Sequence, residues 1–363
     1  MTHSLYSPFA LADLTIPNRM VMAPLTRNRA GDEGVPTGMM VKFYAQRASA
    51  GLIISESAPI SQQGVGYPHT PGLFSSEQTA GWLRVVNAVH SEGGRIFAQL
   101  QHCGRISHPS HQVDQATPIS PSAIAPSGQA VTTNGMLDFV TPRRLDQSEI
   151  PSIVAQFKAA AENAKAAGFD GIEVHGANGY LIDQFLRDGT NTRTDGYGGS
   201  VENRMRFLNE VIDAVTEVFP LSRIGVRLTP ENTFNDMRDS DPKRHFEYIV
   251  SGLSGYGLAY LHVLEGDMAG GPRSVDYRKL RDAFRGNYIA NNGYDKSRAE
   301  AAISGGDADL IAFGTPFLAN PDLVRRYRDN LVLNNVDHTT FYGGDETGYT
   351  DYPFIGDLLS SAA

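Results

Sequence analysis

The sequence predicts a single α/β domain built as a (β/α)8 barrel, and three observations favour that fold. Eight short apolar or β-branched segments recur along the 363 residues. Most of them are followed by a segment whose apolar residues have helical spacing. The alternation is regular enough to favour a closed barrel of eight units over a doubly wound open sheet.

The strands and helices can be placed in chain order. Between strands, 145–168 has apolar residues at helical spacing, a capping-box pair in Asp146 and Glu149, and Gly168 to end the helix. The segment 200–219 repeats this helical pattern. The eight expected strands occupy 19–26, 51–58, 95–102, 171–177, 223–230, 259–266, 287–293 and 309–315.

Two regions are additions to the barrel, although we treat residues 1–363 as one domain. Residues 103–144 are rich in Pro, Ser, Gly and Gln and are too long for an ordinary connection of ~2–6 residues. We expect them to form a hairpin or an excursion over one face, after the third strand. The C-terminal extension, 330–363, contains aromatic residues in FYGGDETGYTDYPF, which predicts packing on the barrel.

Composition excludes several classes of function. The net charge is −9, which argues against binding of nucleic acid or of an anionic membrane surface. No apolar run approaches the ~20 residues of a membrane span, and the N-terminus lacks a secretory pattern. Cys103 is the single cysteine, so no internal disulfide forms. We expect a cytoplasmic protein whose partner is a small molecule.

Polar residues gather at the expected carboxyl ends of the strands, where barrel enzymes have their active sites. Side chains two residues apart on a strand share a face, so hydrogen-bonding groups from four strands should converge at this end. The residues that share a face are Met22, Pro24 and Thr26; Gln99, Gln101 and Cys103; Glu173 and His175; and Gly225, Arg227 and Thr229.

The last two strands end differently, each in a glycine turn before an expected helix. The turns are NNGYD at 291–295 and FGTPF at 313–317. Backbone N–H groups at such turns bind phosphate, and the loops after strands seven and eight often form the phosphate site of a barrel. These turns predict a phosphorylated ligand.

At this point the motifs resemble those of the Old Yellow Enzyme family, the FMN-dependent NAD(P)H ene-reductases. The resemblance covers nearly the whole chain, in the correct order. It is most similar to the bacterial branch of xenobiotic, N-ethylmaleimide and nitroester reductases. The motifs are APLTRNRA (23–30), ISESAPIS (54–61), FAQLQHCGRISHP (97–109), HGANGYLIDQFLRDGTNTRTDGYGGSVENR (175–204) and GYTDYP (348–353).

The resemblance implies a role for the polar residues after the fourth strand. His175 and Asn178 look like the paired donors to the carbonyl or nitro oxygen of the substrate, where negative charge develops during hydride transfer. Tyr180 looks like the acid that protonates the α-carbon. Neutral donors also suit the binding of the nicotinamide amide in the same pocket.

The resemblance also implies a cofactor site for FMN, with NADPH or NADH as the reductant. Thr26 resembles the hydroxyl at flavin O4, Gln99 the amide at the pyrimidine edge, and Arg227 the cation near N1 and O2. Arg227 could instead pair internally with Glu56 or Glu173. The remaining implied FMN residues are Pro24, Leu25, Ala58, Asn292, Gly293, Gly314 and Thr315, and the implied substrate residues are Tyr67, Gln101, Tyr342, His175 and Asn178.

Three positions depart from the family pattern. Gln101 stands where related reductases commonly have tryptophan, which predicts a roomier, wetter pocket. Cys103 replaces a small hydroxyl residue and is expected to be a buried packing residue. Thr315 replaces an arginine that grips the phosphate, which predicts FMN retention weaker by roughly ten- to a hundredfold. Lys296, Arg298 or Arg325 could supply the lost charge.

The function predicted from these residues is the reduction of activated C=C bonds in unsaturated aldehydes, ketones, maleimides and nitroalkenes, with nitrate esters as a variant. Two alternatives stay open: a barrel isomerase or carbon–carbon lyase that binds a phosphosugar, and a binder of FMN or another ligand with little turnover. We expect no metal site, since His102 and His108 belong to no metal-ligand cluster. A monomer or a homodimer is expected.

Overall fold

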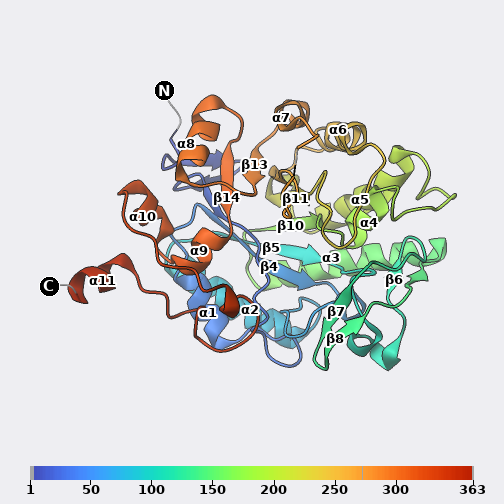
Figure 1. Cartoon of the computed structure of the whole chain (residues 1–363), viewed down its shortest axis with the longest axis horizontal. Helices are drawn as coiled ribbons and strands as arrows, with labels where there is room; N and C mark the ends of the chain where they lie inside the picture. Colours follow the sequence, from blue (N-terminus) through green and yellow to red (C-terminus); the bar gives the residue numbers. More distant parts are fainter. Residues whose placement is uncertain (1–3, 272, 362–363) are drawn as a thin grey trace.

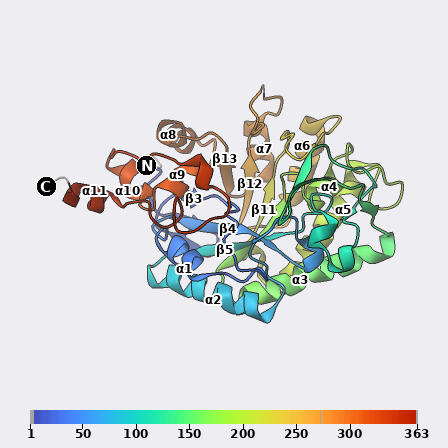
Figure 2. The same cartoon turned by 60° about the horizontal axis from the view of Figure 1, so that its bottom comes forward.

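The computed structural model describes residues 4–271 and 273–361, and within them eight parallel strands form a closed barrel (Figures 1 and 2). The strand β14 pairs with β3, and β5 pairs with β10, so the sheet has no open edge. The predicted barrel is confirmed, and each predicted strand overlaps an observed one. The barrel strands are β3 (Met20–Met22), β4 (Leu52–Pro59), β5 (Ile96–Gln101), β10 (Gly171–Gly176), β11 (Ile224–Leu228), β12 (Tyr260–Leu264), β13 (Tyr288–Asn291) and β14 (Leu310–Phe313).

Helices surround the barrel. The capping box of Asp146 and Glu149 is present as predicted, and Gly168 follows the third helix with φ 84°. Ser200 caps the helix predicted at 200–219 by accepting from the backbone N–H of Asn203. The outer helices are α1 (Gly38–Ala45), α2 (Ser76–Ser91), α3 (Ile150–Ala166), α5 (Val201–Thr216), α6 (Pro242–Leu253), α7 (Tyr277–Phe284), α8 (Lys296–Gly305) and α10 (Leu323–Arg328).

An apolar plug fills the barrel at the amino ends of its strands. The hairpin of β1 (Phe9–Leu11) and β2 (Leu14–Ile16) packs there against buried side chains that include Phe97 and Tyr260. Apolar filling at this end leaves the polar residues of the same strands for the opposite, carboxyl end. The short helices α4 (Leu181–Leu186) and α9 (Thr315–Ala319) follow β10 and β14 at that end.

Residues 103–144 form the excursion after β5. Its later part, from residue 119 onward, is closed by parallel pairing of β6 (Ile119–Ser120) with β9 (Arg143–Arg144). Between them β7 (Gln129–Thr132) and β8 (Gly135–Asp138) form an antiparallel hairpin. The short 3-10 helices of the chain are η1 (Gln62–Gly64), η2 (Pro109–His111), η3 (Val113–Gln115), η4 (Gln147–Glu149), η5 (Leu221–Arg223) and η6 (His338–Thr340).

The C-terminal extension returns to the barrel before it ends in α11 (Ile355–Ser361). Tyr349 is fully buried, and its ring stacks on that of Phe43 with centroids 4.2 Å apart. Arg27 donates to the carbonyl oxygens of Phe341 and Gly348, at 2.8 and 2.9 Å. The extension is therefore tied to the loop after β3 that leads out of the candidate site. Residues 362–363 lie outside the described residues. No described helix combines the length and the apolar character that crossing a bilayer requires.

Candidate active site

A cavity of about 530 Å³ opens at the carboxyl ends of the barrel strands. Its volume is in the range typical of small-molecule sites. Strands β4, β10 and β11, together with the segment after β3 and several loops, supply its walls. The residues expected from the sequence that line it are Pro24, Leu25, Thr26, Tyr67, His175, Asn178, Tyr180, Arg227 and Tyr342.

Several lining residues were not expected from the sequence. Val131 comes from the excursion hairpin, and Phe234 and Met268 come from the loops after β11 and β12. Phe234 and Met268 are 45% and 46% exposed, and partly exposed apolar side chains beside polar ones often mark a binding site. Ser57 contributes a hydroxyl from β4. The base of the cavity, which we call its floor, is thus polar. Its outer edge is apolar, and we call Val131, Phe234 and Met268 its lip.

His175 lies at the floor as a neutral imidazole. Burial, together with the positive charge of Arg227 and the neighbouring His262, holds the pKa of His175 well below its usual value. Its Nδ1 atom is buried and has no hydrogen-bond partner among the described residues. The ring meets that of Tyr180 edge-on, with centroids 5.2 Å apart. A neutral imidazole carries one N–H donor, which is what binding of a developing anion requires.

Tyr180 belongs to a small cluster with Cys103 and Ile106, against which Tyr67 packs. The Tyr180 hydroxyl donates to the Tyr67 hydroxyl at 3.2 Å. Burial, followed by the proximity of Tyr67, raises the pKa of Tyr180 well above 10. The phenol is therefore protonated at neutral pH and has a proton to donate.

Asn178 sits in the turn between β10 and α4, in the left-handed region with φ 56°. Its backbone N–H donates to Thr229 Oγ1 at 2.9 Å, and its carbonyl accepts from Asn235 Nδ2 at 2.8 Å. Both contacts come from the segment after β11. A strained conformation held by two such bonds aims the side chain into the cavity in a defined direction.

A layer of buried polar residues lies beneath His175 in the barrel. Glu173 accepts from Gln99 Nε2 at 2.7 Å and from His262 Nδ1 at 2.9 Å. Burial raises the pKa of Glu173, but His262 and Arg227 outweigh it and hold the pKa below its usual value. Ser57 donates to the Gln99 amide oxygen at 2.6 Å. The layer is thus an ordered set of charges and dipoles directly below the cavity.

Within the described residues, Arg227 forms no ion pair with Glu56 or Glu173, the two carboxylates that the sequence suggested as partners. Its Nη2 donates to Asn291 Oδ1 at 3.2 Å, while Nε is buried and has no partner. Glu56 instead accepts from the Arg27 backbone N–H at 3.2 Å and the Tyr44 hydroxyl at 3.3 Å. Arg227 therefore offers an unused N–H and a positive charge on the cavity wall.

The two glycine turns lie where the sequence placed them, outside the lining of this cavity. Asn292 and Gly293 have φ of 87° and 69°, so the first turn is built from left-handed residues. Thr315 is the first residue of α9, after Gly314. Of the three cations offered as replacements for the lost arginine, Arg298 contacts the first turn: its Nη1 donates to the carbonyls of Asn292 and Gly293, at 3.2 and 3.1 Å.

Gln101 and Cys103 form a buried pair rather than a cavity wall. Gln101 is 4% exposed and its Nε2 donates to Cys103 Sγ at 2.8 Å. Burial raises the pKa of the Cys103 thiol to about 12, so it is an inert packing group. His102 is also buried, which lowers its pKa to about 3, and its Nδ1 accepts from the Gly104 N–H. Gln99 and Ala58, both fully buried, likewise do not line the cavity.

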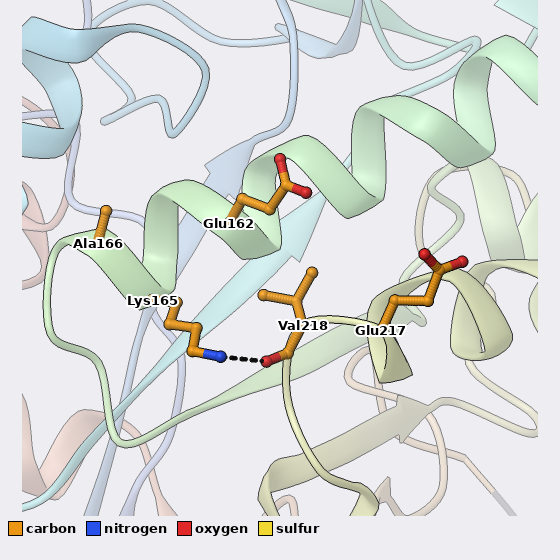
Figure 3. Close-up of a pocket in the computed structure, with 5 residues that line it drawn as sticks. All are labelled: Glu162, Lys165, Ala166, Glu217 and Val218. Carbon is orange, nitrogen blue, oxygen red and sulfur yellow. Dashed lines mark hydrogen bonds between the residues drawn. The ribbon is translucent and has the colours of Figure 1, made fainter.

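Not every hollow on the described surface is a candidate site. One hollow lies between α3 and the end of α5, lined by Glu162, Lys165, Ala166, Glu217 and Val218 (Figure 3). The Lys165 ammonium there donates to the Val218 carbonyl at 2.9 Å, so it serves the packing of two helices.

A group of potential metal ligands lies away from the cavity. Asp188, Asp239 and His245 place one ligand atom each within 4.8 Å of one another. The guanidinium of Arg204 lies 3.0 Å from His245 Nδ1. Because a guanidinium at that distance repels a cation, we assign no metal site to this group.

Comparison with known proteins identifies the family. The model of the NADH:flavin oxidoreductase / NADH oxidase family matches residues 4–334. The structure of the Old Yellow Enzyme homologue from Zymomonas mobilis superposes with a TM-score of 0.93 at 42% identity, covering 96% of this chain and 99% of that one. The chain belongs to the Old Yellow Enzyme family. The predicted resemblance is therefore confirmed, and so is the prediction of an FMN cofactor.

Other known proteins are similar over nearly the whole chain. The structure of morphinone reductase has a TM-score of 0.95 at 46% identity and covers 99% of this chain and 98% of that one. A probable flavin mononucleotide-dependent alkene reductase of Leishmania infantum is 44% identical over 353 residues, 96% of each chain. The 12-oxophytodienoate reductase 7 of Oryza sativa subsp. japonica is 44% identical, covering 97% of this chain and 95% of that one.

The residues present fit FMN. The cavity has the volume for a planar ring system with a substrate above it, and its wall carries the unpartnered Nε of Arg227 and the Thr26 hydroxyl. A positive charge at this place suits the electron-rich end of a reduced flavin. The left-handed turn at Asn292 and Gly293 suits a phosphate. The residues around this cavity therefore suit the FMN cofactor of the Old Yellow Enzyme family.

Proposed function

We propose that this chain is an FMN-dependent ene-reductase that uses NADPH or NADH to reduce C=C bonds activated by a carbonyl or nitro group. Unsaturated aldehydes, ketones, maleimides and nitroalkenes are the expected substrates, and nitrate esters are a further class. The observation that carries the proposal is the convergence of His175, Asn178 and Tyr180 on one cavity that also contains Arg227. Packing alone does not require three neutral donors in one place.

The donors act on the oxygen of the activating group. FMN, when bound, supplies the hydride that it has received from the nicotinamide. His175 and Asn178 hold the substrate oxygen through N–H groups and stabilise the negative charge that develops on it. Loss of one such donor costs about 10²–10³ in rate in other enzymes. The low pKa of His175 keeps it a neutral donor, so that its N–H stays in place through the reaction.

Tyr180 completes the reduction by delivering a proton to the α-carbon of the substrate. Its hydroxyl is protonated at neutral pH, and its bond to Tyr67 orients it toward one side of the cavity. The apolar lip of Val131, Phe234 and Met268 excludes water from the reacting atoms and suits the hydrocarbon part of a cyclic enone. The same residues are proposed to receive the nicotinamide ring, since the two ligands bind in turn.

A single spectroscopic experiment tests the proposal. The purified protein is examined by visible spectroscopy, then mixed anaerobically with NADPH, and then with 2-cyclohexenone. Bleaching of an oxidised flavin band followed by its recovery is the expected result. Bleaching without recovery, for any acceptor of the classes named, would leave a flavin binder with little turnover. A protein that stays colourless after incubation with FMN would refute the proposal and favour the phosphosugar isomerase or lyase.

A further inference from the structure

The side chain of Asn178 differs from its neighbours in one respect: it can present either polarity to the cavity. A carboxamide has nearly the same shape when its oxygen and NH2 are exchanged. Only the NH2 group donates to a substrate oxygen, whereas the amide oxygen repels it. The function of Asn178 therefore depends on what holds its amide in one orientation.

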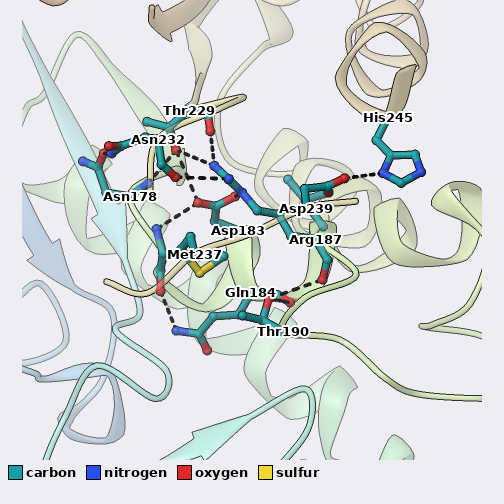
Figure 4. A network of polar contacts seen from close by, with 12 residues as sticks. Asn178, Asp183, Gln184, Arg187, Thr190, Thr229, Asn232, Met237, Asp239 and His245 are labelled. Atoms are coloured by element: carbon teal, nitrogen blue, oxygen red, sulfur yellow. Dashed lines mark hydrogen bonds and ion pairs between the residues drawn. The ribbon is translucent and has the colours of Figure 1, made fainter. Parts of the chain in front are cut away.

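Asn232, from the segment after β11, is the residue in contact with that amide. Its Nδ2 donates to Asn178 Oδ1 at 3.2 Å. Figure 4 shows Asn178, Asn232 and Thr229 together at one end of a polar network that continues to Asp183 and Arg187. When Asn178 Oδ1 is engaged in this way, its NH2 group is the part of the amide left to face the cavity.

The orientation of Asn232 itself is set by the backbone. Its Oδ1 accepts from the N–H groups of Phe234 and Met268, at 3.4 and 3.3 Å. Backbone N–H groups can only donate, so they must meet the oxygen of Asn232, and its NH2 must point the other way, toward Asn178. Arg187 Nη1 fixes the main chain by donating to the Asn232 carbonyl at 3.1 Å.

Burial makes this arrangement specific. Asn232 is 1% exposed, so water does not replace a lost partner without cost. Phe234 and Met268, whose N–H groups anchor Asn232, also line the lip of the cavity. The position of the lip and the polarity of the donor are therefore linked through one buried side chain.

We propose that Asn232 is a positioning residue that fixes the polarity of Asn178, so that the Asn178 NH2 group faces the substrate oxygen. This inference rests on the proposed function, in which Asn178 donates to that oxygen. It adds a residue that touches neither substrate nor flavin and that acts through Asn178.

Asn232→Asp is the sharpest test because it inverts the polarity with almost no change in shape. A carboxylate cannot donate to Asn178 Oδ1, but it accepts from Asn178 Nδ2, so the Asn178 amide turns over and presents its oxygen to the cavity. We expect kcat/KM for 2-cyclohexenone to fall by about 10²–10³, as for loss of an oxyanion donor. Asn232→Leu removes the contact without imposing the opposite orientation, and a smaller fall is expected.

The decisive readout is the carbonyl stretching frequency of carbon-13-labelled 2-cyclohexenone bound to the oxidised holoenzyme. Hydrogen-bond donation lowers this frequency. We expect Asn178→Ala and Asn232→Asp both to raise it relative to the wild type, and Asn232→Asp to have no further effect in the Asn178→Ala background. Asn191→Asp is the matched control: Asn191 is 3% exposed, its oxygen accepts from a backbone N–H, and it does not line the cavity.

The outcomes separate this inference from the proposed function. If Asn178→Ala raises the frequency while Asn232→Asp and Asn232→Leu leave it unchanged, the positioning role is overturned and the donor role stands. If Asn178→Ala itself changes neither frequency nor turnover, the donor role fails and the inference fails with it. If Asn191→Asp moves the frequency as much as Asn232→Asp, the effect is a general one of buried charge, and the positioning role is overturned.

Discussion

Replacing Tyr180 with phenylalanine tests the proposed proton donor most directly. The change removes one hydroxyl whose protein partner is the Tyr67 hydroxyl at 3.2 Å, and leaves the ring in its cluster with Cys103 and Ile106. The perturbation is therefore confined to the proton and one hydrogen bond.

The magnitude follows from what else near Tyr180 carries a proton. The Cys103 thiol has a pKa raised to about 12 by burial and is engaged by Gln101, so it is a poor substitute. Tyr67 lies one hydrogen bond farther away. A positioned acid contributes about 10²–10⁴ in rate, or ~3–5 kcal/mol of activation free energy. We expect the step that reduces 2-cyclohexenone to slow by that factor.

Stopped-flow measurement of the two half-reactions separates chemistry from structure. Reduction of the flavin by NADPH uses no proton from Tyr180, so Tyr180→Phe should leave its rate unchanged. Reoxidation by ferricyanide, which needs no protonation of carbon, should also be unchanged. Of the three reactions, only reoxidation by 2-cyclohexenone should slow. An unchanged rate with 2-cyclohexenone would refute the role of Tyr180, and an equal slowing of all three reactions would mean that the hydroxyl acts through the shape of the cavity.

Three further predictions concern the cofactor and the stability of the barrel. Thr315→Arg should restore a charge-assisted phosphate contact and tighten FMN binding by roughly ten- to a hundredfold, measured by titration of apo-protein, while Thr315→Ser should leave the affinity unchanged. Burial raises the pKa of Glu56 from 4.5 to about 7. Because the pKa of Glu56 is higher in the folded state, the folded protein loses stability as the pH rises between those two values. Glu56→Gln should therefore raise the free energy of unfolding in urea by up to about 3 kcal/mol at about pH 8 and by little at about pH 4. Equal gains at both pH values would contradict this. Asp183→Asn removes the negative charge that lies 2.9 Å from the buried guanidinium of Arg187 and should cost about 3–5 kcal/mol, measured by urea unfolding. The control Glu149→Gln, which breaks an exposed pair, should cost about 1 kcal/mol or less.

Much of the barrel could be predicted from the local spacing of apolar residues. A strand that packs on both faces is apolar along its length, and a helix on its outside is apolar at every third or fourth residue, so both can be found without knowing their neighbours. The capping box at Asp146 and Glu149 is likewise a matter of residues three apart. The alternation of side chains between the two faces of a strand, here called parity, also placed Thr26, His175 and Arg227 at one end of the barrel.

Parity was less informative where a side chain had a choice of partner. Gln101 has the parity of Gln99, yet neither lines the cavity, because Gln101 turns to Cys103 and Gln99 to Glu173. Gln101 therefore does not line the cavity, and the roomier pocket expected from it stays a prediction. Which of three cations approaches the first glycine turn was also open, and in the fold Arg298 contacts it.

The sequence by itself determined the barrel and the end at which the candidate site lies, because strand period and residue spacing are local properties of the chain. Its resemblance to the Old Yellow Enzyme family added the three candidate donors. Only the tertiary structure decided what closes the cavity and which way its donors face. Val131, Phe234 and Met268 reach the lip from three distant segments, and the polarity of Asn178 depends on Asn232, 54 residues away. Such choices depend on which loops meet once the barrel has closed, since a carboxamide carries no preference for either orientation until a partner supplies one.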